Sequence, residues 1–202
     1  HPNLSEFTSE LFYDGRLRAH ESTERQLIES STGFAGANLW YLPVHHEGNQ
    51  SYSEQEIACI HHLMRQLVRG EWISHDGIRR PLTLDDILVV APYNEQVRRI
   101  HAAIPGVRAG TVDKFQGQEA AMVIYSLTSS TPEDAPRGME FLYDPHRFNV
   151  ATSRARCACI VVGDERLFAP QCRTPRQMQL ANVLCRYAEM STRITLELAA
   201  AV

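Results

Sequence analysis

Four short apolar runs between residues 87 and 163 restrict the fold of the chain more than any other feature. They occupy residues 87–91, 107–112, 121–127 and 159–163. The run Ile-Leu-Val-Val-Ala shows the type, because β-branched residues follow one another as in a strand covered on both faces. Between the runs, residues 94–103 and 144–155 have apolar positions at helical spacing. This alternation predicts an α/β domain with a parallel β-sheet flanked by helices.

The remaining segments complete one domain. We expect helices over 3–13, 53–69 and 175–190, a short strand over 39–42, and polar loops over 18–37, 74–81 and 128–139. A chain of 202 residues is long enough for one full-sized domain. We assign residues 1–190 to it, of which 1–37 form an opening helix and an irregular segment, and we expect a tail over 191–202.

The basic residues exclude one kind of nucleotide site. Lys114 is the only lysine, and all other basic side chains apart from histidines are arginines. A P-loop needs a Gly-Lys-Ser/Thr sequence, because its ammonium group reaches the β- and γ-phosphates. Lys114 stands instead between Asp113 and Phe115. These 202 residues therefore carry no P-loop of their own.

Charge, cysteine content and hydropathy restrict the partners and the cellular compartment that we expect. The formal net charge is −4, yet residues 137–176 contain seven arginines against four acids, so a local basic surface is compatible with the acidic whole. Five cysteines, an odd number at uneven spacing, favour reduced thiols and a cytoplasmic location. No apolar run approaches the ~18 residues that a membrane-spanning helix needs, so we expect no membrane partner. The paired histidines lack the ligand spacing of a metal site.

The strand ends are where we expect chemistry, because parallel α/β sheets bind ligands beyond the carboxyl ends of their strands. Pro92, Tyr93 and Asn94 directly follow the first run. The proline fixes a turn, the tyrosine ring can contact a base of a single strand, and the asparagine can cap the next helix. Taken alone, a tight turn with a half-buried tyrosine explains this segment better.

Residues 110–119 combine a strand end with a glycine-containing turn. Thr111 offers a hydroxyl and an amide to a phosphate, Gly117 lets a ligand approach the backbone, and Glu119 places a carboxylate before the next strand. An ordinary turn with a solvated glutamate is the alternative.

Residues 147–156 form an arginine-rich segment. If the segment is helical throughout, Asn149, Ser153 and Arg156 are neighbours, and Arg154 points about 100° away from Ser153. Unpaired arginines suit a transferring phosphoryl group, because guanidinium groups neutralise its oxygens bidentately. Surface arginines on an amphipathic helix are the alternative.

In combination, these segments resemble the second RecA-like domain of superfamily 1 helicases of the nonsense-mediated-decay and Okazaki-processing type. Residues 1–17 are similar to the stretch that opens that domain, 90–96 to helicase motif IV, 111–119 to motif V and 149–156 to motif VI. The resemblance covers residues 1–168. The loop over 128–149 and the segment 172–175 further resemble bacterial proteins in which such a helicase follows a RecB-like nuclease domain.

The resemblance implies a role for each matching position. Arg154, as an arginine finger, and Glu119 would be catalytic, with ATP and Mg²⁺ held mainly by an upstream RecA-like domain. The implied ATP-binding residues are Gly117, Gln118, Glu119, Arg154 and Arg156. The implied contacts with single-stranded nucleic acid are Pro92, Tyr93, Asn94, Thr111 and Asn149. Gln116 and Ser153 would couple the two sites.

We therefore expect the C-terminal motor half of an ATP-dependent DNA helicase or translocase, inactive as an isolated fragment. Phosphate, sugar and stacking contacts serve DNA and RNA alike, so an RNA helicase domain stays open, and the nuclease-linked resemblance favours DNA. A non-catalytic nucleic-acid-binding or docking module is a further alternative. The missing P-loop disfavours a self-contained phosphohydrolase.

Overall fold

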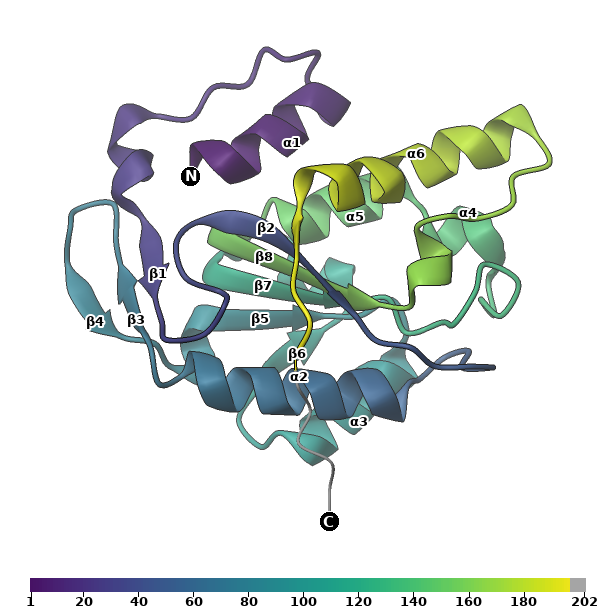
Figure 1. Ribbon diagram of the computed structural model, residues 1–202, viewed down its shortest axis with the longest axis horizontal. Coiled ribbons are helices and arrows are strands. Elements are labelled where there is room, and N and C mark those ends of the chain that lie inside the picture. Colours follow the sequence, from purple (N-terminus) through teal and green to yellow (C-terminus); the bar gives the residue numbers. More distant parts are fainter. Residues whose placement is uncertain (197–202) are drawn as a thin grey trace.

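A computed structural model of the chain describes residues 1–196, and its centre is a six-stranded parallel sheet. The strand order is β6-β5-β7-β8-β2-β9, and every neighbouring pair is parallel. The strands are β2 (Asn38–Pro43), β5 (Ile87–Val90), β6 (Arg108–Gly110), β7 (Ala120–Ser126), β8 (Ala155–Gly163) and β9 (Thr192–Arg193). Figure 1 shows the central strands pointing the same way. The predicted α/β architecture is confirmed.

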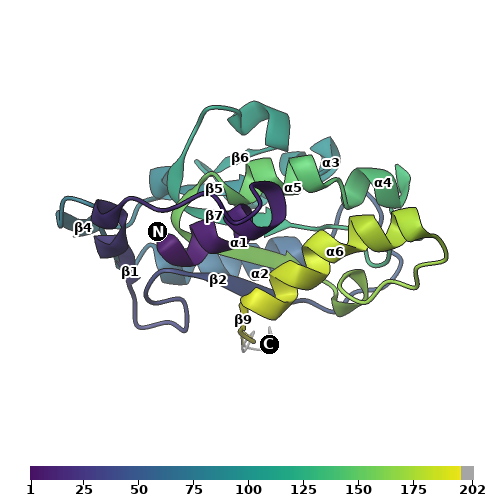
Figure 2. The same ribbon diagram turned by 90° about the horizontal axis from the view of Figure 1, so that it is seen from above.

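Helices cover both faces of this sheet (Figures 1 and 2). One face packs against α2 (Glu54–Leu67) and α3 (Asn94–Ala103). The other face packs against α1 (Pro2–Phe12), α5 (Pro145–Thr152) and α6 (Pro175–Met190). A short helix, α4 (Gly138–Leu142), lies beside α6.

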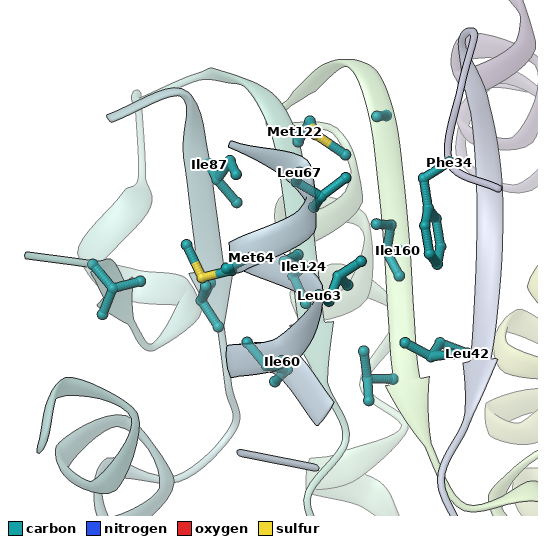
Figure 3. Packing of buried hydrophobic residues seen from close by; sticks show 14 of the residues in the cluster. Phe34, Leu42, Ile60, Leu63, Met64, Leu67, Ile87, Met122, Ile124 and Ile160 are labelled. Carbon is teal, nitrogen blue, oxygen red and sulfur yellow. The ribbon is translucent and has the colours of Figure 1, made fainter. Parts of the chain in front are cut away.

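Strand residues alternate between the two hydrophobic layers because side chains of a strand point to opposite faces. Ile87, Ile124 and Ile160 face α2, whose Ile60 and Leu63 are fully buried against them (Figure 3). The neighbouring strand residues face the other layer, which includes Leu88, Val123, Val161, Phe7 and Phe148. Burial on both faces explains why the central strands β5, β7 and β8 are largely apolar.

The cysteines are free thiols, three of them buried in the core. Burial raises the pKa of Cys59, Cys157 and Cys159 to about 12. Cys172 and Cys185 are half-exposed.

A second, antiparallel sheet was not predicted. It consists of β1 (Leu27–Glu29), β3 (Glu71–Ile73) and β4 (Arg79–Pro81), in the order β1-β3-β4. Arg79 donates across it to Glu29 at 2.8 Å and to Glu71 at 3.1 Å. The loops expected over 18–37 and 74–81 are therefore partly ordered as strands. Each strand is only three residues long and partly polar, which leaves no periodicity to recognise.

The end of α5 differs from the helix expected over 144–155. The helix ends at Thr152, and β8 begins at Ala155. The carbonyl oxygen of Arg154 accepts a hydrogen bond from the amide of Ala120 at 3.1 Å, so the sheet captures this backbone. Arg156 consequently lies on a strand and is not a helical neighbour of Asn149.

Short 3₁₀ helices complete the chain: η1 (Glu21–Arg25), η2 (Leu84–Asp86), η3 (Val112–Phe115) and η4 (Glu165–Leu167). The strand expected over 107–112 is shorter, because its last residue begins η3. Strand β9 lies in the expected tail over 191–202, of which residues 197–202 lie outside the described part. None of the helices within residues 1–196 is long and apolar enough to cross a membrane.

Candidate functional site

The predicted site residues lie at two opposite edges of the sheet. Pro92–Asn94 and Thr111 follow β5 and β6, at the carboxyl ends of the strands. Residues 116–119 precede β7, and residues 153–156 lie at the start of β8. The expectation that all the chemistry gathers at the carboxyl ends is therefore wrong. Because β7 and β8 are parallel neighbours, their first residues, Ala120 and Ala155, pair and bring the segments before them together.

A groove of about 340 Å³ lies at the carboxyl ends of the strands. Four of the five residues predicted to contact nucleic acid line it, namely Pro92, Tyr93, Asn94 and Thr111. The fifth, Asn149, does not line it. The remaining lining residues are Ser51, Glu95, Asp113, Arg137, Phe141 and Arg147.

Two of the groove residues differ from their predicted roles. Tyr93 is only 7% exposed, and burial raises the pKa of its hydroxyl, which accepts a hydrogen bond from Ser129 at 3.4 Å. Most of its ring is therefore unavailable for stacking. Asn94 does not cap α3, because Tyr93 occupies the N-cap position. Asn94 is instead the exposed first residue of that helix.

Thr111 and Arg147 supply polar groups to the groove. Thr111 occupies the N-cap position of η3 without a side-chain capping bond, so its hydroxyl is not used there. The Arg147 guanidinium contacts the Asp113 carboxylate at 3.3 Å. This contact ties α5 to η3 at the groove wall.

Arg137 and Phe141 are the residues that sequence reasoning missed. They lie i, i+4 apart around the start of α4, close to motif VI but outside the helicase motifs. The guanidinium carbon of Arg137 lies 3.8 Å from the centre of the Phe141 ring. An arginine four residues before an aromatic residue was the only sequence signal.

At the opposite edge, the arginines are held in different ways. Arg156 Nε lies 3.2 Å from a carboxylate oxygen of Glu119, and both side chains are about half-exposed. Arg154 Nε donates to the carbonyl oxygen of Val150 at 3.0 Å. Within residues 1–196, no carboxylate lies within ion-pair distance of Arg154. Its guanidinium is thus oriented by the end of α5 while its charge is not neutralised.

The turn before β7 is built around Gly117. Its φ of +79° lies in the left-handed region, which glycine adopts without a steric penalty. Gln118 is engaged within the protein, because its amide oxygen accepts from Arg108 at 3.0 Å and its amide nitrogen donates to the Lys114 carbonyl at 3.1 Å. All four residues of this turn, 116–119, are exposed, and Glu119 and the backbone at Gly117 are the groups open to a ligand.

This edge fits the phosphates of a nucleotide better than it fits a metal ion. Two half-exposed guanidinium groups share it with Glu119, whose carboxylate is engaged by Arg156. Guanidinium groups match phosphate oxygens in geometry and charge. In the part of the chain that the structure describes, no cluster of three metal-binding side chains forms.

Helix α5 connects the two edges. Arg147, in its first turn, lines the groove, whereas the carbonyl of Val150, near its end, holds Arg154. Gln116 lines a smaller cavity of about 210 Å³ together with Asp113, Arg147 and Val150, so it lies between the edges. The Ser153 hydroxyl donates to the same Val150 carbonyl at 3.4 Å.

Asn149 is the predicted residue whose placement is least expected. Its side-chain oxygen is buried and, among the described residues, has no hydrogen-bond partner. The structure thus places Asn149 on the connecting helix rather than in the groove.

The start of α1 also lies at the arginine edge. The backbone nitrogen of His1 donates to the carbonyl oxygen of Arg156 at 2.8 Å. A cavity of about 140 Å³ there is lined by residues of α1 and by Ser153.

Comparison with known proteins identifies relatives of this arrangement. A family described as an AAA domain (AAA_12) matches residues 1–166. The DNA polymerase alpha-associated DNA helicase A of Schizosaccharomyces pombe is 29% identical over 177 residues, covering 81% of this chain and 26% of that protein. The DNA replication ATP-dependent helicase/nuclease JHS1 of Arabidopsis thaliana is 36% identical over 99 residues, covering 48% and 7%.

A third relative is the regulator of nonsense transcripts 1 homolog of Drosophila melanogaster. It is 24% identical over 182 residues, covering 85% of this chain and 15% of that protein. The chain thus spans only between 7% and 26% of the lengths of these three relatives.

Proposed function

This chain belongs to the AAA_12 family, the C-terminal RecA-like domain of superfamily 1 helicases, and from that membership we propose that it is the second motor half of an ATP-dependent DNA helicase or translocase. It would act together with an upstream RecA-like domain that supplies the P-loop missing here. The two domains would meet at the arginine edge, where Arg154 and Arg156 would face the nucleotide between them.

The observation that carries the proposal is the separation of the two sets of residues. Arginines that suit phosphates lie at the amino ends of β7 and β8, whereas the groove lies at the carboxyl ends of β5 and β6. A motor needs a nucleotide site and a track that are distinct but mechanically connected. Helix α5 supports such a connection, because Arg147 and Val150 contact one set each.

The residues of this chain would divide the work. When bound, ATP with Mg²⁺ supplies a transferable phosphoryl group, and Arg154 would neutralise the charge that develops on it. Arg156 would hold Glu119 toward the nucleotide, near the ribose or the terminal phosphate. Thr111, whose hydroxyl makes no capping bond to η3, would donate that hydroxyl to the nucleic-acid backbone in the groove.

The experiment compares ATP hydrolysis by the full-length protein with that of its Arg154→Ala variant, with single-stranded DNA, single-stranded RNA or neither. Losing an arginine finger costs ~10³–10⁵ in rate. Arg65→Ala is the matched control, because Arg65 is exposed on α2, across the sheet. Near-normal turnover of Arg154→Ala would refute the assignment of the finger. No hydrolysis by the wild-type protein would favour a docking module.

DNA as the track is the finer part of the proposal. The relatives include a DNA helicase and a helicase/nuclease, which supports DNA as the track and a linked nuclease domain. A relative named as a regulator of nonsense transcripts keeps RNA as the competing outcome. Stimulation of hydrolysis by one nucleic acid and not by the other decides between them.

We also propose a cytoplasmic location, because the three buried cysteines are free thiols that suit a reducing compartment. Fractionation of cells that express a tagged full-length protein tests this location.

A further inference from the structure

Arg137 and Phe141 give the groove a contact that none of the helicase motifs assigns. We infer that Arg137, stacked over Phe141, binds a backbone phosphate of the single strand in the groove. The inference rests on the proposed function, because it adds one contact to the proposed track. Phe141 acts as a positioning residue, since it touches Arg137 and not the phosphate.

The first argument is the unbalanced charge of Arg137. Its side chain is exposed, and within residues 1–196 no carboxylate lies within ion-pair distance of it. The other charges of the groove are compensated. Arg147 pairs with Asp113 at 3.3 Å, and Glu95 accepts hydrogen bonds from arginines of its own helix at 2.7 Å. The groove therefore carries one free positive charge, which attracts an anion.

The second argument is that the guanidinium is held in a fixed position. Its central carbon lies 3.8 Å from the Phe141 ring centre, and that of Arg147 lies 4.5 Å from the same centre. The Phe141 ring is itself supported by Tyr93, with the two ring centres 5.7 Å apart. An exposed arginine normally samples many rotamers, and stacking reduces that freedom before a ligand arrives.

The backbone explains why these two side chains meet. Gly138 follows Arg137 with a φ of +74°, a left-handed conformation that strains residues with a side chain. This turn starts α4, so that Arg137 at its N-cap and Phe141 stand one helical turn apart on the same side.

The stacked geometry favours a phosphate over a base. One face of the guanidinium is covered by Phe141, whereas its N–H donors point outward in the plane of the group. Phosphate oxygens accept such in-plane donors in pairs. Thr111 lines the same groove, and its hydroxyl, which makes no capping bond to η3, adds a second donor for the backbone.

The test measures how binding depends on salt. Fluorescence anisotropy would follow a labelled oligothymidylate as it binds the full-length protein and the variants Arg137→Ala, Arg137→Lys, Phe141→Leu and Arg65→Ala. The slope of log K against log salt concentration is negative, and the loss of one phosphate contact reduces its magnitude by about 0.7 for single strands. We expect that decrease for Arg137→Ala and none for Arg65→Ala. Circular dichroism melting confirms that each variant is folded.

The other variants separate charge from position. Arg137→Lys keeps the charge but not the planar fork, so we expect the wild-type slope with weaker binding. Phe141→Leu removes the aromatic surface but leaves the Arg137 charge, so we expect the wild-type slope with weaker binding, because the guanidinium is no longer held in position. Wild-type behaviour of Phe141→Leu would overturn its positioning role.

Four outcomes overturn the assignment of Arg137, and the last of them also overturns the proposed function. A slope for Arg137→Ala equal to that of Arg65→Ala, while the wild-type protein binds normally, overturns this inference alone. If the wild-type protein and Arg137→Ala have the same slope on an abasic oligonucleotide but different slopes on oligothymidylate, Arg137 contacts a base and not a phosphate. A raised KM for ATP with an unchanged slope shows that a nucleotide phosphate uses the residue. A wild-type protein that binds no single strand overturns the proposed function as well.

Discussion

Glu56 should be the most sensitive polar residue of this domain. It lies on α2 with a fully buried carboxylate at the carboxyl end of the sheet. The two oxygens accept from the Ser126 hydroxyl at 2.5 Å and from the amide of Thr128 at 3.0 Å, and one oxygen lies 2.9 Å from His46 Nε2. Thr128 has a φ of +73°, which is a strained conformation for a β-branched residue.

The cost of Glu56→Ala follows from the donors that it abandons. A buried donor without a partner costs about 1–3 kcal/mol. The Thr128 amide loses the one acceptor that it has among residues 1–196. The Ser126 hydroxyl can turn toward Thr128 Oγ1 at 3.2 Å, and His46 keeps its hydrogen bond with Ser130 at 2.7 Å. With one hydrogen bond lost completely and two lost in part, we expect Glu56→Ala to lower the free energy of unfolding by about 3–5 kcal/mol. This is the range for breaking a buried pair.

The assay is urea and thermal unfolding of the chain, followed by circular dichroism. For a domain of this size, the expected loss lowers Tm by roughly 6–20 °C. Glu54→Ala is the matched control, because Glu54 lies two residues before Glu56 on the same helix and its side chain is 61% exposed. This substitution should cost less than about 1 kcal/mol. If Glu56→Ala unfolds no more easily than Glu54→Ala, the hydrogen-bond reasoning is wrong.

Three further predictions concern stability and reactivity. Although burial raises the pKa of Asp164, hydrogen bonds from Arg166 and from backbone amides lower it overall to about 2, so its carboxylate stabilises the fold above pH ~4 and loses that effect toward pH 2. Asp164→Asn should therefore cost about 2 kcal/mol at pH 7, with the difference from the wild type closing in urea titrations at pH 2–3. Gly163→Ala should cost about 1–3 kcal/mol in the same unfolding assay, because the added Cβ would lie 2.8 Å from Leu127 Cδ1; an unchanged Tm would contradict this. Of the five cysteines, only the two half-exposed ones should react quickly with Ellman's reagent, and a third fast thiol before denaturation would show that the core is more open than described.

The strongly patterned elements could be predicted from the sequence. The helix expected over 175–190 is α6 with the same bounds, because Thr174 caps it, Pro175 starts it and its apolar residues repeat at helical spacing. The buried runs became strands of the parallel sheet for the same reason, that local pattern and tertiary burial agree.

What could not be predicted depends on contacts between distant segments. Strand β1 pairs with β3 more than forty residues later, and its three residues carry no pattern of their own. The turn from α5 into β8 is decided by the bond between Arg154 and Ala120, which no spacing rule contains. The pairing of Arg137 with Phe141 depends on a left-handed glycine between them. The roles of the motif residues remain predictions.

Because Arg154 and the groove lie at opposite ends of the strands, a small rotation of the domain at one end produces a larger displacement at the other. Strand β7 has seven residues, which at ~3.3 Å per residue separate the two ends by about 23 Å. A tightly packed sheet with helices on both faces turns as a stiff body rather than bending. Each degree of rotation about the arginine edge therefore displaces the groove by about 0.4 Å, and this displacement is proportional to the length of the strands.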